Sequence, residues 1–236
     1  PQVPRAAVEV LEDAGFRVVL PRGPVCCGLT WISTGQLGVA RRVLARTLRV
    51  LAPYAAAGTP VVGLEPSCTA ALRGDLPELL PADERTGRTA RSVHTLAEFL
   101  AAYAPEWEPP NVGRRAITQV HCHQHAVLGF DPDAALLRRA GVDQERLRSG
   151  CCGLAGNFGF ERGHYEVSRQ AGERVLLPAV REAAADTLVL ADGFSCRTQI
   201  EQGTGRQGLH LAEVLAARLR SRRGREPGPG SAGVAL

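Results

Sequence analysis

The tripeptide Cys-Cys-Gly occurs twice in this chain, at 26–28 and at 151–153. Three single cysteines, Cys68, Cys122 and Cys196, bring the total to seven. Adjacent cysteines rarely bridge one another because the ring would be strained, and a chain of 236 residues does not need disulfide staples. Reduced thiols bind zinc or iron–sulfur clusters, or carry out redox chemistry. The cysteines therefore predict metal-binding or redox thiols in a reducing compartment.

The sequence around the two tripeptides repeats in type. An amphipathic helix ending at Ala-Gly precedes each tripeptide, and long helices are expected after them, over 36–58 and 165–186. Short apolar strands are expected over 60–68, 114–122 and 187–196, and each runs up to a cysteine. The copies are 125 residues apart at the paired cysteines (151 minus 26) and 128 at the single ones (196 minus 68).

Alternating strands and helices indicate parallel sheets that are covered by helices. We predict an α/β fold of two tandem repeated parallel-sheet α/β units, with cysteines at the carboxyl ends of the strands. The first cysteine-rich repeat spans 1–105 and the second spans 106–222, followed by a flexible tail over 223–236. Only the second repeat has its own first strand. The chain is therefore expected to begin inside its first repeat, as part of a longer protein; it contains no Met.

The carboxyl ends of neighbouring parallel strands form one binding edge. Cys122 and Cys196 close two predicted strands, and Cys151 and Cys152 lie in the next turn, so these four should share one site. Four thiolates suit zinc or an iron–sulfur cluster, and their spacing alone does not choose between the two.

The first repeat is poorer in ligands. Cys26, Cys27 and Cys68 supply three thiolates, and the fourth position is either upstream of the chain or absent. We expect these three to bind metal weakly or not at all within this chain. In a packed protein the plain alternative for any single cysteine is a buried apolar side chain.

Three histidines, His121, His123 and His125, flank Cys122. In a strand, His121 and His123 would point to the face opposite Cys122. One of them could be a ligand or a proton carrier, and packing or surface roles are the alternative. Glu65 and Asp192 are acids near predicted strand ends that could pair with Arg197 or another element.

Five stretches of the sequence carry a family resemblance: CCGLTWISTGQLGVARRVL, VVGLEPSCTAALRGDLPELL, HCHQHAVLG, GCCGLAGNFGFE and ADGFSCRTQIEQGTGRQGLHLAEVL. They resemble the CCG domain pair of heterodisulfide reductase B, of the iron–sulfur subunits of glycolate oxidase and anaerobic glycerol-3-phosphate dehydrogenase, and of lactate-utilisation proteins. Coverage reaches about Arg220. The resemblance is strongest to the C-terminal region of fused FAD-linked oxidases of the D-lactate dehydrogenase or glycolate oxidase type.

The resemblance implies electron transfer. FAD in an upstream domain would oxidise a 2-hydroxy acid, and electrons would pass through iron–sulfur centres to a quinone, cytochrome or other acceptor. It implies a [4Fe–4S] cluster, with zinc as the alternative, and upstream FAD and ferredoxin-like domains as partners. Heterodisulfide reductase B ends its motif in CxxC, where this chain has Gly193 in the second repeat and Glu65 in the first. A five-thiolate cluster is therefore in doubt.

Composition limits the other classes of function. No apolar run reaches the roughly 18 residues of a membrane span, and a net charge of +4 is too small to indicate nucleic-acid binding. The alternative functions are a zinc-binding or metal-free docking module of the same oxidoreductase, and a thiol–disulfide catalyst. We expect the protein in the cytoplasm, with peripheral association at the inner face of the membrane left open.

Overall fold

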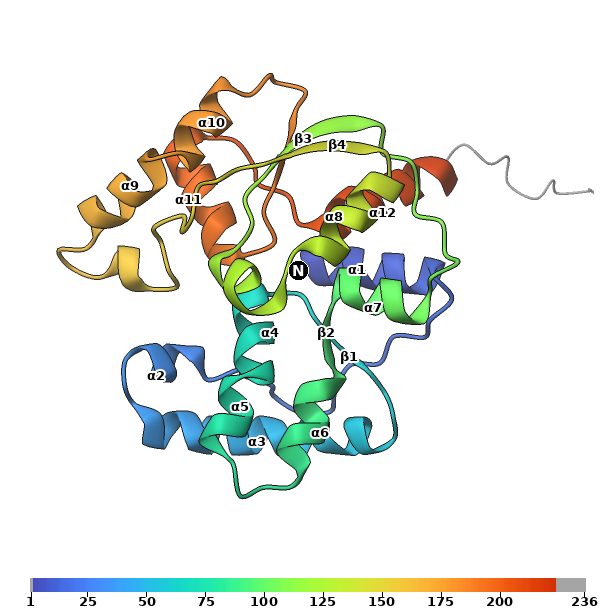
Figure 1. Ribbon diagram of the computed structural model, residues 1–236, viewed down its shortest axis with the longest axis vertical. Helices are drawn as coiled ribbons and strands as arrows, with labels where there is room; N and C mark the ends of the chain where they lie inside the picture. The colour runs from blue at the N-terminus through green and yellow to red at the C-terminus, as the bar shows by residue number, and fades with distance from the viewer. Residues whose placement is uncertain (1, 224–236) are drawn as a thin grey trace, which may run out of the picture.

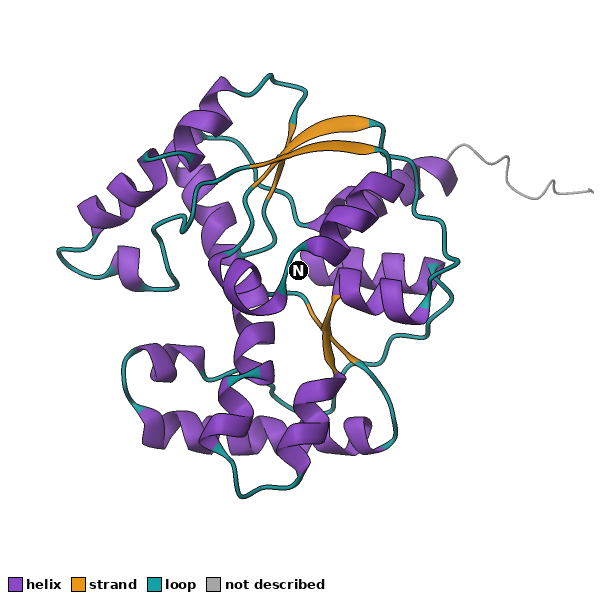
Figure 2. Ribbon diagram, viewed as in Figure 1, coloured by secondary structure: helices purple, strands orange, loops and turns teal. Residues whose placement is uncertain are grey.

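The computed structural model describes residues 2–223, within which five strands form two parallel sheets (Figures 1 and 2). One sheet pairs β1 (Val61–Gly63) with β2 (Val93–Thr95). In the other, β3 (Arg114–Thr118) lies between β4 (Val142–Arg146) and β5 (Leu188–Leu190). The predicted α/β class with repeated parallel-sheet units is confirmed.

The helices are α1 (Gln2–Asp13), α2 (Leu29–Ser33), α3 (Leu37–Ala56), α4 (Pro66–Arg73), α5 (Asp75–Leu79), α6 (Arg85–Ser92), α7 (Leu96–Tyr103), the π-helical turn η1 (Gln124–Leu128), α8 (Asp131–Arg139), the 3₁₀ turn η2 (Phe158–Phe160), α9 (Tyr165–Glu173), α10 (Leu176–Glu182), α11 (Phe194–Thr204) and α12 (Leu211–Arg223).

The long helix predicted after the first Cys-Cys-Gly is confirmed as α3. Its buried residues include Ala40, Leu44, Leu48, Leu51 and Ala55. They recur every three or four positions, which places them on one face of the helix. That face packs into the core of the first repeat together with Cys27.

The helix predicted over 165–186 is wrong as a single element, because the structure breaks it into α9 and α10. Val175 has φ −148°, which ends the first helix and starts the second. Pro178 then occupies the third position of α10. A proline lacks the N–H that a helix interior requires and is tolerated in a first turn, so the chain restarts the helix just before it.

The predicted strands are too long at their carboxyl ends. β1, β3 and β5 end at Gly63, Thr118 and Leu190, and the single cysteines follow in the next helical turn. Cys68 is the third residue of α4, where Pro66 fixes the first position, and Cys196 is the third residue of α11. The cysteines follow the strands in the order expected, yet they are carried by helix N-termini.

Two parts of the fold were not predicted from the sequence. The unit α6–β2–α7 has a sequence signal in Thr95 and Glu98, which form a capping box at the start of α7. The strand β4 has none, because Val-Asp-Gln-Glu-Arg lacks the apolar alternation of a half-buried strand. It forms by pairing along its length with β3.

The first and last helices of the described chain pack on each other (Figure 1). The Arg220 guanidinium contacts the Glu9 carboxylate at 2.9 Å, and Trp107 Nε1 donates to Asp13 at 3.0 Å. One hydrophobic core joins α1, α7, α8 and α12. Helices from both sides of the predicted boundary at 105/106 therefore share a core, and the division into 1–105 and 106–222 stays a prediction. The predicted tail lies outside the described residues except for Arg223, the last residue of α12.

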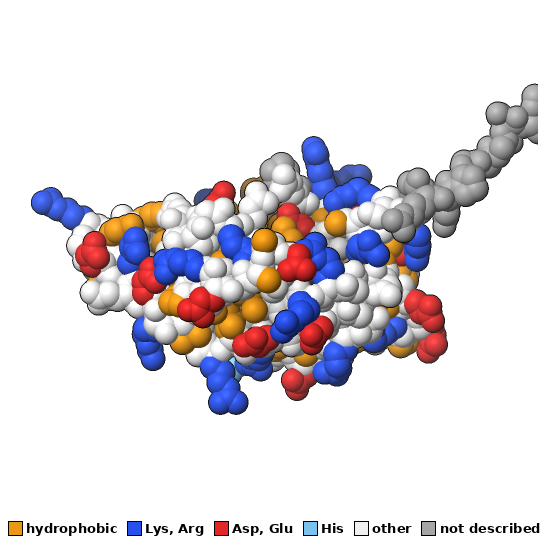
Figure 3. Space-filling view, turned by 90° about the horizontal axis from the view of Figure 1, so that it is seen from above, with side chains coloured by type: hydrophobic (Ala, Val, Ile, Leu, Met, Phe, Trp, Pro, Cys, Tyr) orange, Lys and Arg blue, Asp and Glu red, His pale blue; other side chains and the backbone are white. Residues whose placement is uncertain are grey.

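Acidic and basic side chains are interspersed over the face seen in Figure 3, with no continuous basic patch on it. Among residues 2–223, no helix combines the length and the apolar character needed to cross a lipid bilayer.

A buried acid predicts an unusual pH dependence. Asp133, in the first turn of α8, is 3% exposed, and burial, with a smaller contribution from Asp192, raises its pKa well above 3.8. A raised folded pKa means that the folded state binds more protons than the unfolded state between pH 4 and that pKa. In this window the free energy of unfolding should fall as pH rises, by up to about 1.4 kcal/mol per pH unit.

Asp133→Asn should remove this slope and raise stability at pH 7, because no buried carboxyl then has to be protonated or ionised in the core. Urea unfolding at a series of pH values measures it. Asp131→Asn, an exposed acid of the same turn, is the matched control and should keep the slope of the parent protein. The same slope in Asp133→Asn would contradict the assignment.

Candidate metal centre

Three neighbouring strands position the cysteines of the second repeat. β4, β3 and β5 are adjacent and parallel, so their carboxyl ends meet at one edge. Cys122 follows β3, Cys151 and Cys152 follow β4, and Cys196 follows β5. Cys152 and Cys196 are buried, at 3% and 2% exposure, whereas Cys151 is exposed.

The thiols of Cys122, Cys151 and Cys152 perturb one another's pKa values. Hydrogen bonds from Cys122 and Cys152 hold the pKa of Cys151 well below its ordinary value, and the Gly153 N–H donates to Cys151 Sγ at 3.4 Å. The same contacts, with burial, raise the pKa of Cys122 and of Cys152, and Cys152 also contacts Cys196. Among these thiols, Cys151 is the one whose ionised form its neighbours favour. A bound cation would replace the thiol protons.

Glycines shape the turn that carries Cys151 and Cys152. Gly153 has φ +96°, and a Cβ there would run into the Ser168 carbonyl of α9. Gly156 has φ +69°, but a Cβ there would meet no atom within 4 Å. The first glycine is therefore required both by backbone conformation and by close packing, and the second by conformation alone.

Gly153→Ala should lower the free energy of unfolding by at least about 2 kcal/mol, because it adds a backbone collision to a left-handed conformation. Gly156→Ala, the matched control, should cost about 1 kcal/mol from the conformation alone. Urea unfolding of the metal-free protein compares them. Equal losses in the two variants would mean that the turn does not pack on α9 as described.

The histidines lie closer to Cys122 than the sequence indicated. His121 Nδ1 and His123 Nδ1 are 3.9 Å and 3.8 Å from Cys122 Sγ, and the two rings stack. The expectation that they point away is wrong, because β3 ends at Thr118, His121 follows in a loop, and Cys122 and His123 begin a helical turn. Burial lowers the pKa of His121, which is 5% exposed. His125 lies apart, with its Nδ1 2.7 Å from Arg146.

The missing fifth cysteine has a structural explanation. A Cβ on Gly193 would collide with the His121 ring, so with His121 in this place no side chain fits where heterodisulfide reductase B has its extra cysteine. At the corresponding position of the first repeat, Glu65 Oε2 accepts a hydrogen bond from the Phe194 backbone N–H at 2.8 Å. Glu65 therefore caps α11, the helix that carries Cys196, which is favourable for a carboxylate at a helix N-terminus.

Neither strand-end acid forms an ion pair with Arg197 among the described residues. The Arg197 side chain donates to the Ala191 carbonyl, and Asp192 Oδ1 accepts from the Leu211 backbone N–H at 2.8 Å. The bond from Glu65 to Phe194 was not foreseen from the sequence, because it joins residues 129 positions apart.

The first repeat brings two of its three cysteines together. Cys27 Sγ and Cys68 Sγ are 3.1 Å apart, and this hydrogen bond lowers the pKa of Cys27 to about 7. Cys26 is exposed, and its backbone N–H donates to Thr47 Oγ1 at 2.9 Å. Within residues 2–223 no fourth cysteine of this repeat is present, so the group has fewer thiols than that of the second repeat.

Comparison with known proteins agrees with the two repeats. Residues 1–73 and 133–201 match the CCG cysteine-rich domain. The chain belongs to this family. Each matched segment of the CCG family contains one Cys-Cys-Gly and the single cysteine that follows it, whereas Cys122 lies outside both.

Curated relatives carry the names of oxidoreductases and of a protein of lactate metabolism. The chain is 28% identical over 230 residues to a protein named as one subunit of the anaerobic glycerol-3-phosphate dehydrogenase of Escherichia coli, covering 93% of this chain and 56% of that protein. It is 29% identical to lactate utilization protein A of Geobacillus kaustophilus, covering 92% and 93%. It is 28% identical to E. coli D-2-hydroxyglutarate dehydrogenase, covering 91% of this chain and 21% of that protein. The chain thus spans about half the length of the first of these relatives.

Proposed function

We propose that this chain is the iron–sulfur electron-transfer region of an FAD-dependent 2-hydroxy-acid dehydrogenase of the D-lactate or glycolate type. The observation that carries the proposal is the placement of Cys122, Cys151, Cys152 and Cys196 directly after three adjacent parallel strands, whose carboxyl ends meet at one edge of the sheet. Support comes from CCG-family membership and from relatives named as dehydrogenases, one of which is named for a 2-hydroxy acid.

The four thiols fit an iron–sulfur cluster by their chemistry. Neighbouring thiols lower the pKa of Cys151, and those of Cys122 and Cys152 are raised, so that a metal would displace their protons. A cluster bound there, which we propose to be [4Fe–4S], would supply one-electron transfer. The protein's part is to hold four sulfurs in the segments that follow three adjacent strands, to bury Cys152 and Cys196 away from water, and to keep Cys151 at the surface. The exposed side is where electrons would enter or leave.

The proposed reaction divides between domains. Hydride removal from the hydroxy acid belongs to a flavin domain upstream, next to a ferredoxin-like segment, and this chain passes electrons to a quinone, cytochrome or other acceptor. Support for such a larger assembly is that one relative is named as part of a multi-subunit enzyme and another is nearly five times longer than the matched region. Seven unpaired cysteines favour the cytoplasm, including the inner face of the membrane.

A zinc-binding docking module is the second candidate, and one observation favours it. His121, Cys122 and His123 offer donor atoms that lie within 4.8 Å of one another, and mixed Cys/His donors are typical of zinc. The colour of the purified protein distinguishes the two candidate functions. Anaerobically purified protein should be brown with broad visible absorption if the proposal is right, and a colourless protein containing stoichiometric zinc would reject it.

A further inference from the structure

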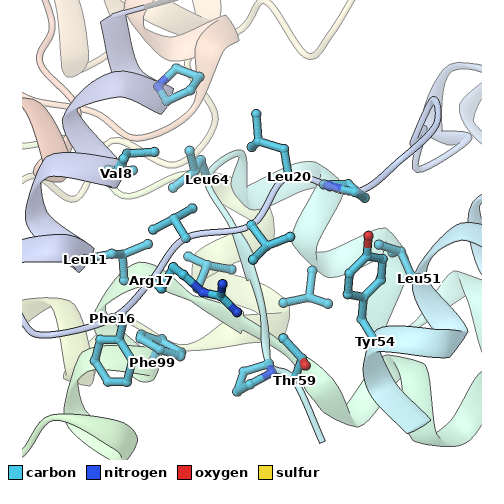
Figure 4. A pocket seen from close by; sticks show the side chains of 18 residues that line it. Val8, Leu11, Phe16, Arg17, Leu20, Leu51, Tyr54, Thr59, Leu64 and Phe99 are labelled. Carbon is cyan, nitrogen blue, oxygen red and sulfur yellow. The ribbon is translucent and has the colours of Figure 1, made fainter. Parts of the chain in front are cut away.

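An apolar groove of about 320 Å³ lies beside β1, away from the cysteines of the second repeat. Figure 4 shows its lining. One wall is the extended segment 16–20, the other is 59–64, and Leu11 of α1 and Tyr54 of α3 close it on either side. The lining is almost entirely aliphatic and aromatic, with Arg17 as its one charged side chain.

Each wall of the groove contains backbone N–H and C=O groups that lack a hydrogen-bond partner on at least one side. The residues 17–20 make no backbone hydrogen bond to any other residue in the range 2–223. β1 pairs with β2 along one edge, and no described strand lies along its other edge. Val19 and Leu20 are 53% and 76% exposed. Open strand edges next to exposed apolar side chains are surfaces to which another strand adds.

The second repeat shows what fills the same place. There β3 lies between β4 and β5 and hydrogen-bonds to both. With the repeat spacing of 125 residues, β4 at 142–146 corresponds to residues 17–21, and with the spacing of 128, β5 at 188–190 corresponds to 60–62. These are the two walls of the groove. The counterpart of β3 therefore belongs between them.

We propose that the groove receives an extended strand of about five residues from the polypeptide that directly precedes α1 in a longer protein. The strand would run parallel to β1, as β3 runs parallel to β5. Its carboxyl end would lie toward Cys26, Cys27 and Cys68, because in the second repeat Cys122 follows β3 at the same sheet edge at which the other cysteines follow β4 and β5. This strand and the turn after it would then cover the side of Cys26, Cys27 and Cys68 that the described residues leave open. The inference rests on the repeat and on the groove, and it holds whether or not the second repeat carries iron.

Hydrogen–deuterium exchange tests it on two proteins: the chain 1–236, and the encoded protein extended upstream of residue 1 by on the order of 20 residues, enough for a strand and a turn. In the extended protein the amides of 17–20 and 61–63 should exchange at least about tenfold more slowly, while those of β3 and β5 stay unchanged. Unchanged rates at 17–20 and 61–63, or an upstream sequence without an apolar segment, would overturn the proposal.

Two variants sharpen the test. Leu20→Glu should leave the melting temperature of chain 1–236 unchanged because Leu20 is exposed there, and should lower it in the extended protein, where the strand would cover it. Val167→Glu, at an exposed apolar position of α9 (54% exposure), is the control and should be neutral in both. A neutral Leu20→Glu in the extended protein would contradict the proposal. So would slow, concentration-dependent exchange of 17–20 in chain 1–236, because a second copy would then be the occupant.

Discussion

Cys152→Ser in the flavin-containing protein to which we assign this chain should slow reduction of the terminal acceptor by roughly 100-fold. Cys152 is 3% exposed and interacts with both Cys151 and Cys196. Its replacement therefore removes the ligand that lies between these two. Losing even an outer-shell partner of a metal ligand costs about 10–100-fold, and a direct ligand should cost at least as much. Steady-state reduction of a dye or quinone acceptor measures the loss.

Flavin bleaching by substrate should survive the same substitution, because hydride transfer occurs at a flavin held in a pocket of another domain. Stopped-flow absorbance of the flavin is therefore the internal control, together with an unfolding curve to confirm that the variant is folded. The chain 1–236 supplemented with FAD should leave D-lactate and glycolate unoxidised. Turnover by that chain, or loss of bleaching in a folded Cys152→Ser protein, would show that the reaction is divided differently.

Metal content should differ sharply between matched variants of the two repeats in chain 1–236. Cys196→Ser should lower bound iron at least about tenfold, because Cys196 is buried in contact with Cys152. Cys68→Ser, at the equivalent helix position of the first repeat, should retain most of it, because Cys68 contacts Cys27 without a fourth thiol. Iron and acid-labile sulfide per chain, after anaerobic reconstitution, measure the difference. Equal losses from the two variants would contradict the inequality of the repeats.

The repeat, the helix α3 and the position of the second-repeat cysteines after neighbouring strands could be predicted because they follow from local pattern; that these cysteines share one site stays a prediction. Apolar spacing specifies α3, and parallel strands oblige their carboxyl ends to meet. The position of each cysteine within its turn could not be predicted as well. Pro66 starts α4 two residues before Cys68, so a strand expected to reach the cysteine stops at Gly63.

Other parts of the site depend on contacts between distant residues. The collision that keeps Gly193 free of a side chain comes from His121, 72 positions earlier. The cap on α11 comes from Glu65 of the other repeat. The polar strand β4 forms because β3 offers it an edge. No local period or motif encodes such contacts, so the sequence could indicate the missing fifth cysteine but not its physical reason.

Anomalous diffraction from anaerobically grown crystals, recorded at the iron and the zinc absorption edges, would identify the metal and its ligands together. We expect iron signal in the second repeat, with metal about 2.3 Å from sulfur, a typical metal–thiolate distance, and Cys122, Cys151, Cys152 and Cys196 all as ligands. A zinc signal on His121, Cys122 and His123, or an iron centre that leaves Cys196 without a metal bond, would contradict this expectation.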